Sequence, residues 1–400
     1  MSSLRTLLFW CHLATGVAVA LVVLTMSATG VLLTYQKQMT AWADARALAP
    51  TPQAARPGLR LSLDTLVARA AAAVPGTSPT AVTVRAREGA PVEIAFGRER
   101  TLFVDAGTGI VRGEGSRATR AFFAKVTALH RWMGATGERR ALGKSITGVA
   151  NLGFLFLVLS GAVLWWPRNV TRAAVRNVAL FRRGLSGKAR DFNWHHVIGL
   201  WGWVPLVVIV ASGVVISYPW AGNLVYRAAG EAPPPAPPRA EGERASPGRP
   251  RRAEPWRWSG ASMDTLLARA TRRVPAWRSA SLAIARPGAP AVITVDAGTG
   301  GQPQRRAQLT LDAATAEETK WQPFAASSPG RRLRSFLRFA HTGEVFGVAG
   351  QTLAGLVSLG AVLLVWTGLA LSWRRLRAWS ARRSLSAVPR RTRSERTRAA

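Results

Sequence analysis

Five histidines are the side chains of this sequence best suited to hold a metal or a redox group. Each lies in or beside a long run of uncharged residues. A neutral imidazole binds a metal through either ring nitrogen. An ionisable side chain at the edge of such an apolar run is expected to be functional. The five are His12, His130, His195, His196 and His341.

The histidines fall into two groups, according to the ends of the runs that they adjoin. His12 and the His195–His196 pair stand at the starts of the first and third runs. His130 and His341 precede the second and fourth runs. If the runs cross a membrane in turn, the two groups lie on opposite sides of it. A lone imidazole in a membrane usually bonds a neighbouring helix, but a facing pair at each of two levels favours a shared ligand.

A haem suits these donors better than a bare metal ion. Two imidazoles are too few for a closed zinc or copper site. They suffice for a six-coordinate haem, because the porphyrin supplies the other four nitrogens. We therefore predict two b-type haems, an inner one held by His12 and His195 and an outer one held by His130 and His341.

The choice between His195 and His196 depends on spacing. Three histidines, His195 among them, are followed four residues later by glycine, as His-x-x-x-Gly. Residues four apart share a helix face, so the glycine would remove a side chain where a flat macrocycle approaches. This pattern favours His195. The match of Trp10-Cys-His12 with Trp194-His195-His196 would instead favour His196, which stays the alternative ligand.

The surroundings of the outer histidines leave two questions open. Arg131 adjoins His130 and suits a haem propionate as well as a lipid headgroup. The triplets Thr136-Gly-Glu138 and Thr342-Gly-Glu344 follow the two outer histidines. If these triplets are equivalent, His130 and His341 do not occupy matching helical positions.

Composition alone allows two classes of protein. The chain carries 54 Lys and Arg against 20 Asp and Glu, a formal charge of +34, yet 48% of its residues are apolar. A nucleic-acid binder or a membrane protein could show this balance. Four uncharged runs decide for a membrane protein without a nucleic-acid partner, since about 20 apolar residues cross a bilayer. The runs are Cys11–Tyr35, Ser145–Trp166, Val197–Ser217 and Val345–Trp373.

The loops predict the orientation. Pro167–Trp194 carries seven Lys and Arg against one acid, and Arg374–Ala400 carries ten against one. The long stretches Gln36–Ala141 and Tyr218–Glu344 are more balanced, at 16 to 8 and 19 to 10. Short basic loops stay in the cytoplasm, while long domains translocate largely regardless of charge. We expect both termini inside, with anionic lipid or an acidic redox partner at the basic inner face.

The two long stretches share a local repeat. Asp64–Pro75 recurs as Asp264–Pro275, offset by 200 residues. Each copy predicts a helix that is opened by an Asp cap and stopped at Pro. Short alternating runs follow each copy and predict a β-meander. A Pro- and Arg-rich segment from Ala232 through Pro255 predicts a disordered linker.

The spans repeat as well, so the plan is span, module, span, written twice. Leu159-Ser-Gly161 in the second run matches Trp366-Thr-Gly368 in the fourth, and Ser27-Ala-Thr-Gly30 in the first matches Ala211-Ser-Gly213 in the third. Internal repeats of this kind are common where a membrane site lies between halves. We predict an α-helical integral membrane protein with two small α+β modules. Its parts are the N-terminus with an uncleaved first span (1–35), module 1 (36–141), span 2 (142–166), a basic loop (167–194), span 3 (195–217), linker and module 2 (218–344), span 4 (345–373) and a basic tail (374–400).

The sequence holds no cysteine-based redox site within one chain, and no nucleotide site is visible in it. Cys11 is the single cysteine, which excludes disulfides, thiolate zinc sites and iron–sulfur clusters ligated within one chain. The sequence contains no Walker motif and no Gly-x-Gly-x-x-Gly between a strand and a helix.

Five motifs together cover all four spans. They are Leu129-His-Arg-Trp-Met-Gly134, Ser160–Arg168, Asn193–Trp201, Ser217-Tyr-Pro-Trp220 and Arg338–Glu344. In combination they resemble the PepSY-associated transmembrane proteins, which are bacterial inner-membrane proteins with PepSY modules between their spans. The resemblance implies a haem-containing reductase of periplasmic ferric siderophores that serves iron acquisition. It also implies a separate electron donor, a quinol or a cytosolic flavoprotein, because the basic tail holds no flavin or nicotinamide domain.

A rival from another class is a membrane scaffold or sensor without enzymatic activity. Its PepSY modules would bind a periplasmic peptide or protease, and the histidines would only pack helices. The absorption spectrum of the purified protein separates the two readings, since haem gives strong visible bands.

The charge pattern makes a direct prediction of topology. A reporter enzyme fused after Ala400 should be active in the cytoplasm, because ten Arg in the tail oppose its translocation. A reporter fused within module 1 should be active on the outer side. A periplasmic C-terminus would overturn the orientation and exchange the sides of the two haem levels.

Overall fold

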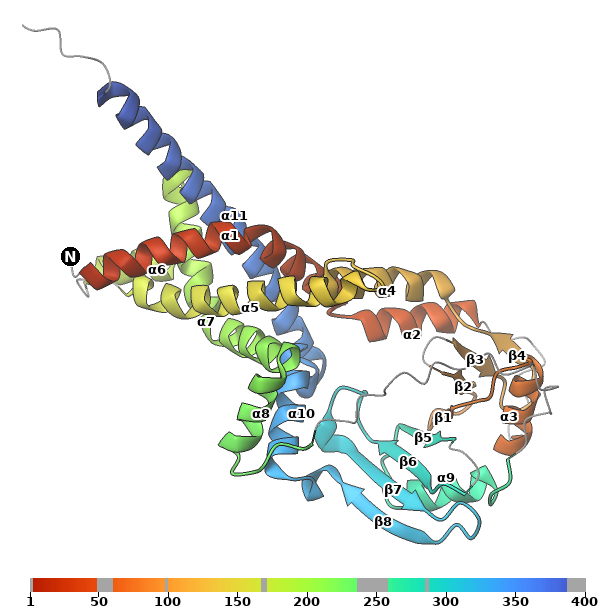
Figure 1. Ribbon diagram of the computed structural model, residues 1–400. Coiled ribbons are helices and arrows are strands. Elements are labelled where there is room, and N and C mark those ends of the chain that lie inside the picture. Colours follow the sequence, from red (N-terminus) through yellow and green to blue (C-terminus); the bar gives the residue numbers. More distant parts are fainter. Residues whose placement is uncertain are drawn as a thin grey trace, which may run out of the picture. The chain divides into compact units, whose positions relative to one another are not determined.

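The computed structural model describes residues 3–48, 60–97, 100–166, 171–235, 258–284 and 288–386. They form two compact units (Figure 1). The membrane unit takes the described residues of Met1–Leu32, Thr127–Val214 and Ala354–Ala400. The sheet unit takes those of Leu33–Val126 and Val215–Leu353. Most of the segment predicted as a linker, Ala232 through Pro255, lies outside the described residues.

Four helices among the described residues are long and apolar enough to cross a membrane, which confirms the predicted four-span architecture. They extend beyond the apolar runs, because helical hydrogen bonding continues into polar flanks. The third begins at Gly187 rather than near Val197, so His195 lies within the helix and not at its head. The helices are α1 (Ser3–Leu33), α5 (Arg139–Trp165), α7 (Gly187–Ser217) and α11 (Gly347–Ser386).

Polar contacts join the helices of the membrane unit. Lipid is as apolar as leucine, so close packing and hydrogen bonds must specify which helices pair. Asn151 of α5 donates from Nδ2 to the Val210 carbonyl of α7 at 3.1 Å. Trp203 of α7 donates from Nε1 to the Val158 carbonyl of α5, also at 3.1 Å. Short α6 (Arg172–Ala179) lies in the basic loop before α7.

The sheet unit is built on one eight-stranded antiparallel sheet, in the order β4-β3-β2-β1-β5-β6-β7-β8. The sequence predicted two separate modules, whereas here four strands from each stretch join edge to edge. The strands are β1 (Ala81–Arg85), β2 (Val92–Phe96), β3 (Arg100–Val104), β4 (Val111–Gly113), β5 (Ser279–Ala283), β6 (Ala291–Asp296), β7 (Arg306–Leu311) and β8 (Glu318–Pro323).

The remaining helices surround this sheet or connect it to the spans. Helices α3 and α9 pack side by side on one face and close a core that runs across both groups of strands (Figure 1). Helices α8 and α10 pack against each other. The helices are α2 (Gln36–Ala47), α3 (Leu63–Ala72), α4 (Arg117–Trp132), α8 (Pro219–Ala228), α9 (Met263–Arg272) and α10 (Pro329–His341), with 3₁₀ turns η2 (Pro303–Arg305), η3 (Phe324–Ala326) and η4 (Glu344–Phe346).

Strands β1 and β5 join the two groups of strands. Val82 pairs with Leu282, its counterpart 200 residues later, in their antiparallel ladder. Next to this pair, the Thr83 hydroxyl donates to Ser281 Oγ at 2.9 Å. Neither edge of the central pair is left open, because β2 and β6 continue the sheet on both sides.

The two repeated aspartates stabilise each other's helix rather than their own. The predicted Asp caps are wrong, because α3 is capped by Ser62, whose Oγ accepts from the Thr65 amide. Asp264 Oδ2 accepts from the Leu63 amide at 2.7 Å, and Asp64 Oδ2 accepts from the Met263 amide at 3.2 Å. Each carboxylate thus satisfies an unpaired amide and the positive end of the facing helix.

This exchange predicts that either aspartate holds the start of the opposite helix. Asp264→Ala should cost about 1 kcal/mol, as for loss of a helix cap. Hydrogen exchange should then speed up at the Leu63 end of α3, with Asp64→Ala giving the mirror result at Met263. Glu88→Ala is the control, since Glu88 is exposed and makes no hydrogen bond within the described residues. Faster exchange confined to the mutated helix would contradict the exchange of caps.

Candidate functional site

His12 of α1 is bonded across to α5. Its Nδ1 lies 2.8 Å from Ser160 Oγ. The Ser160 hydroxyl donates its single hydrogen to the Phe156 carbonyl of its own helix, at 2.7 Å. With its hydrogen assigned to this carbonyl, Ser160 accepts from His12, which places the imidazole proton on Nδ1 and leaves Nε2 with a lone pair.

The same arrangement recurs at His195. Its Nδ1 lies 2.9 Å from Thr367 Oγ1 of α11, and that hydroxyl donates to the Leu363 carbonyl at 2.8 Å. By the same reasoning, His195 donates from Nδ1 and carries its lone pair on Nε2. A charge on His12 would act on His195, so the two inner histidines lie in the same part of the membrane unit.

His130 of α4 shows the same imidazole–hydroxyl arrangement a third time. Its Nδ1 lies 2.9 Å from Thr29 Oγ1 of α1, and Thr29 donates to the Thr25 carbonyl at 2.6 Å. Three histidines thus share one protonation pattern. In each case the partner hydroxyl donates its hydrogen to a carbonyl of its own helix and accepts from the imidazole. At His12 and His195 this hydroxyl orients the ring and leaves Nε2 as the nitrogen for a metal.

A glycine follows each of the three hydroxyl residues. A Cβ at Gly161 would lie 3.6 Å from His12 Cε1, and one at Gly30 would lie 3.7 Å from His130 Cε1. At Gly368 the corresponding distance to His195 Cε1 is 3.4 Å. The Ser/Thr-Gly pair therefore forms a seat, with an acceptor for Nδ1 beside a flat backbone against which the ring rests. The sequence repeats contained these pairs, but the spacing argument gave them no role.

The predicted His-x-x-x-Gly glycines face neighbouring side chains. A Cβ at Gly16 would lie 3.8 Å from Leu157, and one at Gly199 would lie 3.8 Å from Leu364, which are ordinary contact distances. Gly134 has φ +77° and follows the end of α4 at Trp132, so the argument from a shared helix face is wrong there. The imidazoles reach across to a neighbouring helix and do not lie along their own.

The structure separates His195 from His196. His196 donates from Nδ1 to the Phe192 carbonyl of its own helix at 2.9 Å, and its ring lies 4.0 Å from the Phe192 ring. Phe192 is half exposed. His195 joins α7 to α11, whereas His196 makes contacts along the exposed side of α7.

The two other candidate residues lie in different surroundings. His341 is the last residue of α10 in the sheet unit and is half-buried. Arg131 is exposed, with its guanidinium 4.9 Å from the Trp132 ring centre. Arg140 lies over the same ring at 3.6 Å. The tryptophan thus holds two cations near the end of α4.

A buried carboxylate positions the segment of α7 that carries His195. Asp191 is 1% exposed. Its Oδ2 lies 2.5 Å from Arg374 Nη1 of α11, and its Oδ1 lies 2.9 Å from Arg190 Nη2. Both arginines stay partly exposed, so these contacts fix geometry more than they add stability. This pair therefore joins α7 to α11 one turn before His195.

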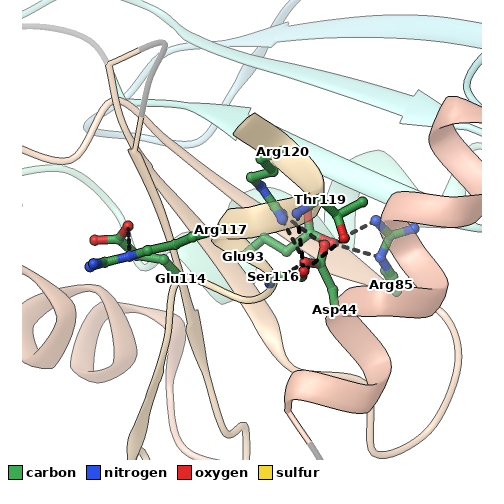
Figure 2. Close-up of polar contacts among 8 residues, drawn as sticks. All are labelled: Asp44, Arg85, Glu93, Glu114, Ser116, Arg117, Thr119 and Arg120. Atoms are coloured by element: carbon green, nitrogen blue, oxygen red, sulfur yellow. Dashed lines mark hydrogen bonds and ion pairs between the residues drawn. The ribbon is translucent and has the colours of Figure 1, made fainter. Parts of the chain in front are cut away.

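A second ion pair positions α4, the helix that carries His130. Asp44 of α2 is buried and accepts two hydrogen bonds from Arg120, at 2.5 and 2.7 Å, and one from the Ser116 amide at 2.8 Å (Figure 2). The hydrogen bond to Asp44 raises the pKa of Arg120 above its ordinary value. Planar paired contacts of this kind fix geometry as well as charge, so α2 holds the start of α4.

Neighbouring ion pairs brace the same corner of the sheet unit. Glu114 bonds Arg117 at 2.9 Å (Figure 2) and Arg100 at 2.7 Å. The hydrogen bond from Arg117, assisted by Arg100, lowers the pKa of Glu114. Arg85 of β1 pairs with Glu93 of β2 at 2.6 Å. These exposed pairs add little stability individually.

Within the described residues, no three of the His, Cys, Asp and Glu side chains gather closely enough to hold a metal ion by themselves. Residues 9–375 match the family described as the PepSY-associated TM region. The chain belongs to this family. No curated protein matches the sequence. Family membership and the four apolar helices together make this PepSY-associated chain a multi-pass membrane protein.

The hydroxyl–imidazole bonds predict a measurable coupling. Ser160→Ala should destabilise this PepSY-associated protein in mixed micelles by about 0.6 kcal/mol, the average for polar contacts between membrane helices. Ser145→Ala is the matched control, since Ser145 of α5 bonds only its own helix within the described residues. In a double-mutant cycle, Ser160→Ala should add nothing to His12→Phe. Additive losses would contradict the direct bond.

Proposed function

We propose that this protein is a di-haem b oxidoreductase of the bacterial inner membrane, which passes electrons outward to a periplasmic ferric chelate in the manner of a ferric-siderophore reductase. The observation that carries the proposal is the shared protonation pattern of His12, His130 and His195. Each donates from Nδ1 to a hydroxyl, and at His12 and His195 this leaves Nε2 for a metal.

The fit to haem is supported by access as well as by protonation. Among the described residues, no buried side-chain nitrogen or oxygen lacks a hydrogen-bond partner. His12 makes one hydrogen bond within these residues, through Nδ1, so its Nε2 is not buried. A metal-binding histidine almost always donates its other N–H to an oxygen, which is the arrangement at all three seats.

The inner haem would be held by His12 and His195. Their place in the same part of the membrane unit, and the matching seats Ser160-Gly161 and Thr367-Gly368, support this pairing. The contacts of His196 along its own helix make it the weaker candidate. The outer haem would be held by His130 and His341, with Arg131 as a possible propionate contact; for this pair the proposal rests on the sequence and on the seat of His130.

Bound haems would supply one-electron carriers at the two levels, which the protein's own side chains lack. The chain's residues would orient the rings and exclude water around them. Reduction of ferric iron weakens its hold on hard oxygen ligands, so a reductase outside the membrane would release the metal. The electron donor would be a separate quinol or cytosolic flavoprotein reductase.

The orientation and the modules belong to the same proposal. Both termini would be cytoplasmic, with the sheet unit outside as two PepSY-like modules of a duplicated plan. The pairing of Val82 with Leu282 and the exchanged Asp64 and Asp264 bonds support an origin by duplication. On the inner face, α6 places exposed Val175 among arginines, as a helix at an anionic lipid surface does.

The alternative is a scaffold or sensor whose PepSY modules bind a periplasmic peptide or protease. Under it, the hydroxyl–imidazole bonds would only join helices. Both readings need the hydroxyl–imidazole bonds, and they differ in whether Nε2 of His12 and His195 binds a metal.

Haem content tests the proposal directly. The purified protein should show b-type Soret and α bands, and a colourless protein would support the scaffold. His195→Ala should remove about half of the haem, because one of two iron sites loses an axial ligand. His196→Ala is the matched control and should remove little. Equal loss from both variants, or loss from His196→Ala alone, would show that His195 was wrongly chosen over His196 as the inner ligand.

A further inference from the structure

A basic hollow lies in the sheet unit, where the end of α9 meets β7 and β8. Its volume is about 300 Å³. Three arginines and one glutamate line it above Leu311, which gives the hollow a formal charge of +2. The arginines are Arg269, Arg272 and Arg273, and the glutamate is Glu318.

The corresponding place in the first half of the sheet unit is built differently. Arg69, the counterpart of Arg269, donates from Nη1 to the Thr108 carbonyl at 2.5 Å. Gly109 has φ +70°, and a Cβ there would overlap the Arg69 guanidinium. Arg69 is therefore bound to the turn. The counterparts of Arg272 and Arg273 are Ala72 and Ala73.

The turn itself is the same in both halves. Asp105 Oδ1 accepts from the Thr108 amide at 2.9 Å, and Asp312 Oδ1 accepts from the Thr315 amide at 2.8 Å. The amides of Thr315 and Ala314 lower the pKa of Asp312, so this carboxylate stays ionised and keeps the turn. The difference between the halves therefore lies in the side chains around the turn and not in its hydrogen bonding.

Ala316 keeps the Arg269 side chain from binding the turn as Arg69 does. It occupies the position of Gly109 with φ +59°, a conformation that costs free energy for any residue with a Cβ. Its Cβ stands where the first half admits a guanidinium. The Arg269 side chain is exposed and makes no hydrogen bond or ion pair within the described residues. A strained alanine thus keeps Arg269 from the turn, and two added arginines stand beside it.

The other arginines leave the hollow open to an anion. Arg273 pairs with Glu318 at 2.6 Å and lies 5.7 Å from the Trp321 ring centre. Arg272 donates from Nε to the Ala268 carbonyl at 3.3 Å, which leaves its other N–H groups available. A volume of about 300 Å³ is at the lower end for small-molecule sites, so the hollow suits a small ligand. Guanidinium groups match carboxylate and phosphate in pairs of hydrogen bonds.

We propose that this hollow is a binding site for a small anion with two or more carboxylate or phosphate groups. Arg269 and Arg272 would contact the ligand directly. Glu318 would limit affinity, because its charge opposes the anion and occupies Arg273. The inference is independent of the haems, since every residue in it lies in the sheet unit.

Calorimetric titration of the full chain in detergent tests the site, with citrate as the probe. Citrate should bind in a saturable manner and more tightly than acetate, because several carboxylates engage several guanidinium groups. Titration with inorganic phosphate shows which of the two oxyanions the hollow prefers. Arg269→Gln with Arg272→Gln should weaken binding about tenfold or more, as expected for loss of charge-assisted contacts.

Two variants test the site without removing an arginine. Ala316→Gly should weaken binding, because Arg269 can then turn to the Thr315 carbonyl as Arg69 does to Thr108. Glu318→Gln should strengthen binding, because it removes a like charge and releases Arg273. Arg69→Gln is the matched control and should leave binding unchanged. No saturable binding of citrate or phosphate, or equal losses in the Arg69 and Arg269–Arg272 variants, would overturn the proposal.

Discussion

Three hydrogen bonds between imidazoles and hydroxyls join helices of the membrane unit. Apolar contact cannot choose between helix partners in lipid, because every lipid chain offers the same contact. A polar group in this medium needs a partner within the protein. Each of the three hydroxyls donates its hydrogen to a backbone carbonyl of its own helix; they belong to Ser160, Thr29 and Thr367. Each can then only accept, and the histidine that it meets must be the donor.

This constraint links folding to chemistry. The bonds join α1 to α5, α4 to α1 and α7 to α11, so correct assembly of the helices sets the protonation of each ring. A hydroxyl that was still able to donate would leave the tautomer undecided. The local i−4 bond of Ser and Thr, usually a minor feature of helices, here determines which nitrogen a metal would find.

The sequence predicted the features that depend on neighbouring residues. An apolar run of about 20 residues has one stable outcome in a bilayer, and all four spans were therefore predictable. The start of α7 was not, because the charge of Asp191 is balanced by Arg190 and also by Arg374, which lies 183 residues later. Capping failed for a related reason. Asp64 was placed correctly at a helix start, but the helix that it stabilises begins at Met263.

The candidate ligands show the same division. The histidines could be found from residue type and position. The Ser/Thr-Gly seats could be recognised only as repeats, because the neighbouring sequence does not reveal which hydroxyl donates its hydrogen within its own helix. Departures between the two halves of the sheet unit were visible as well but carried no meaning by themselves. Ala316 looks like a weakened copy of Gly109 until the position of Arg69 shows what a Cβ there excludes. A turn that is repeated in both halves can thus lose one contact, and the side chain released from it becomes available for a ligand.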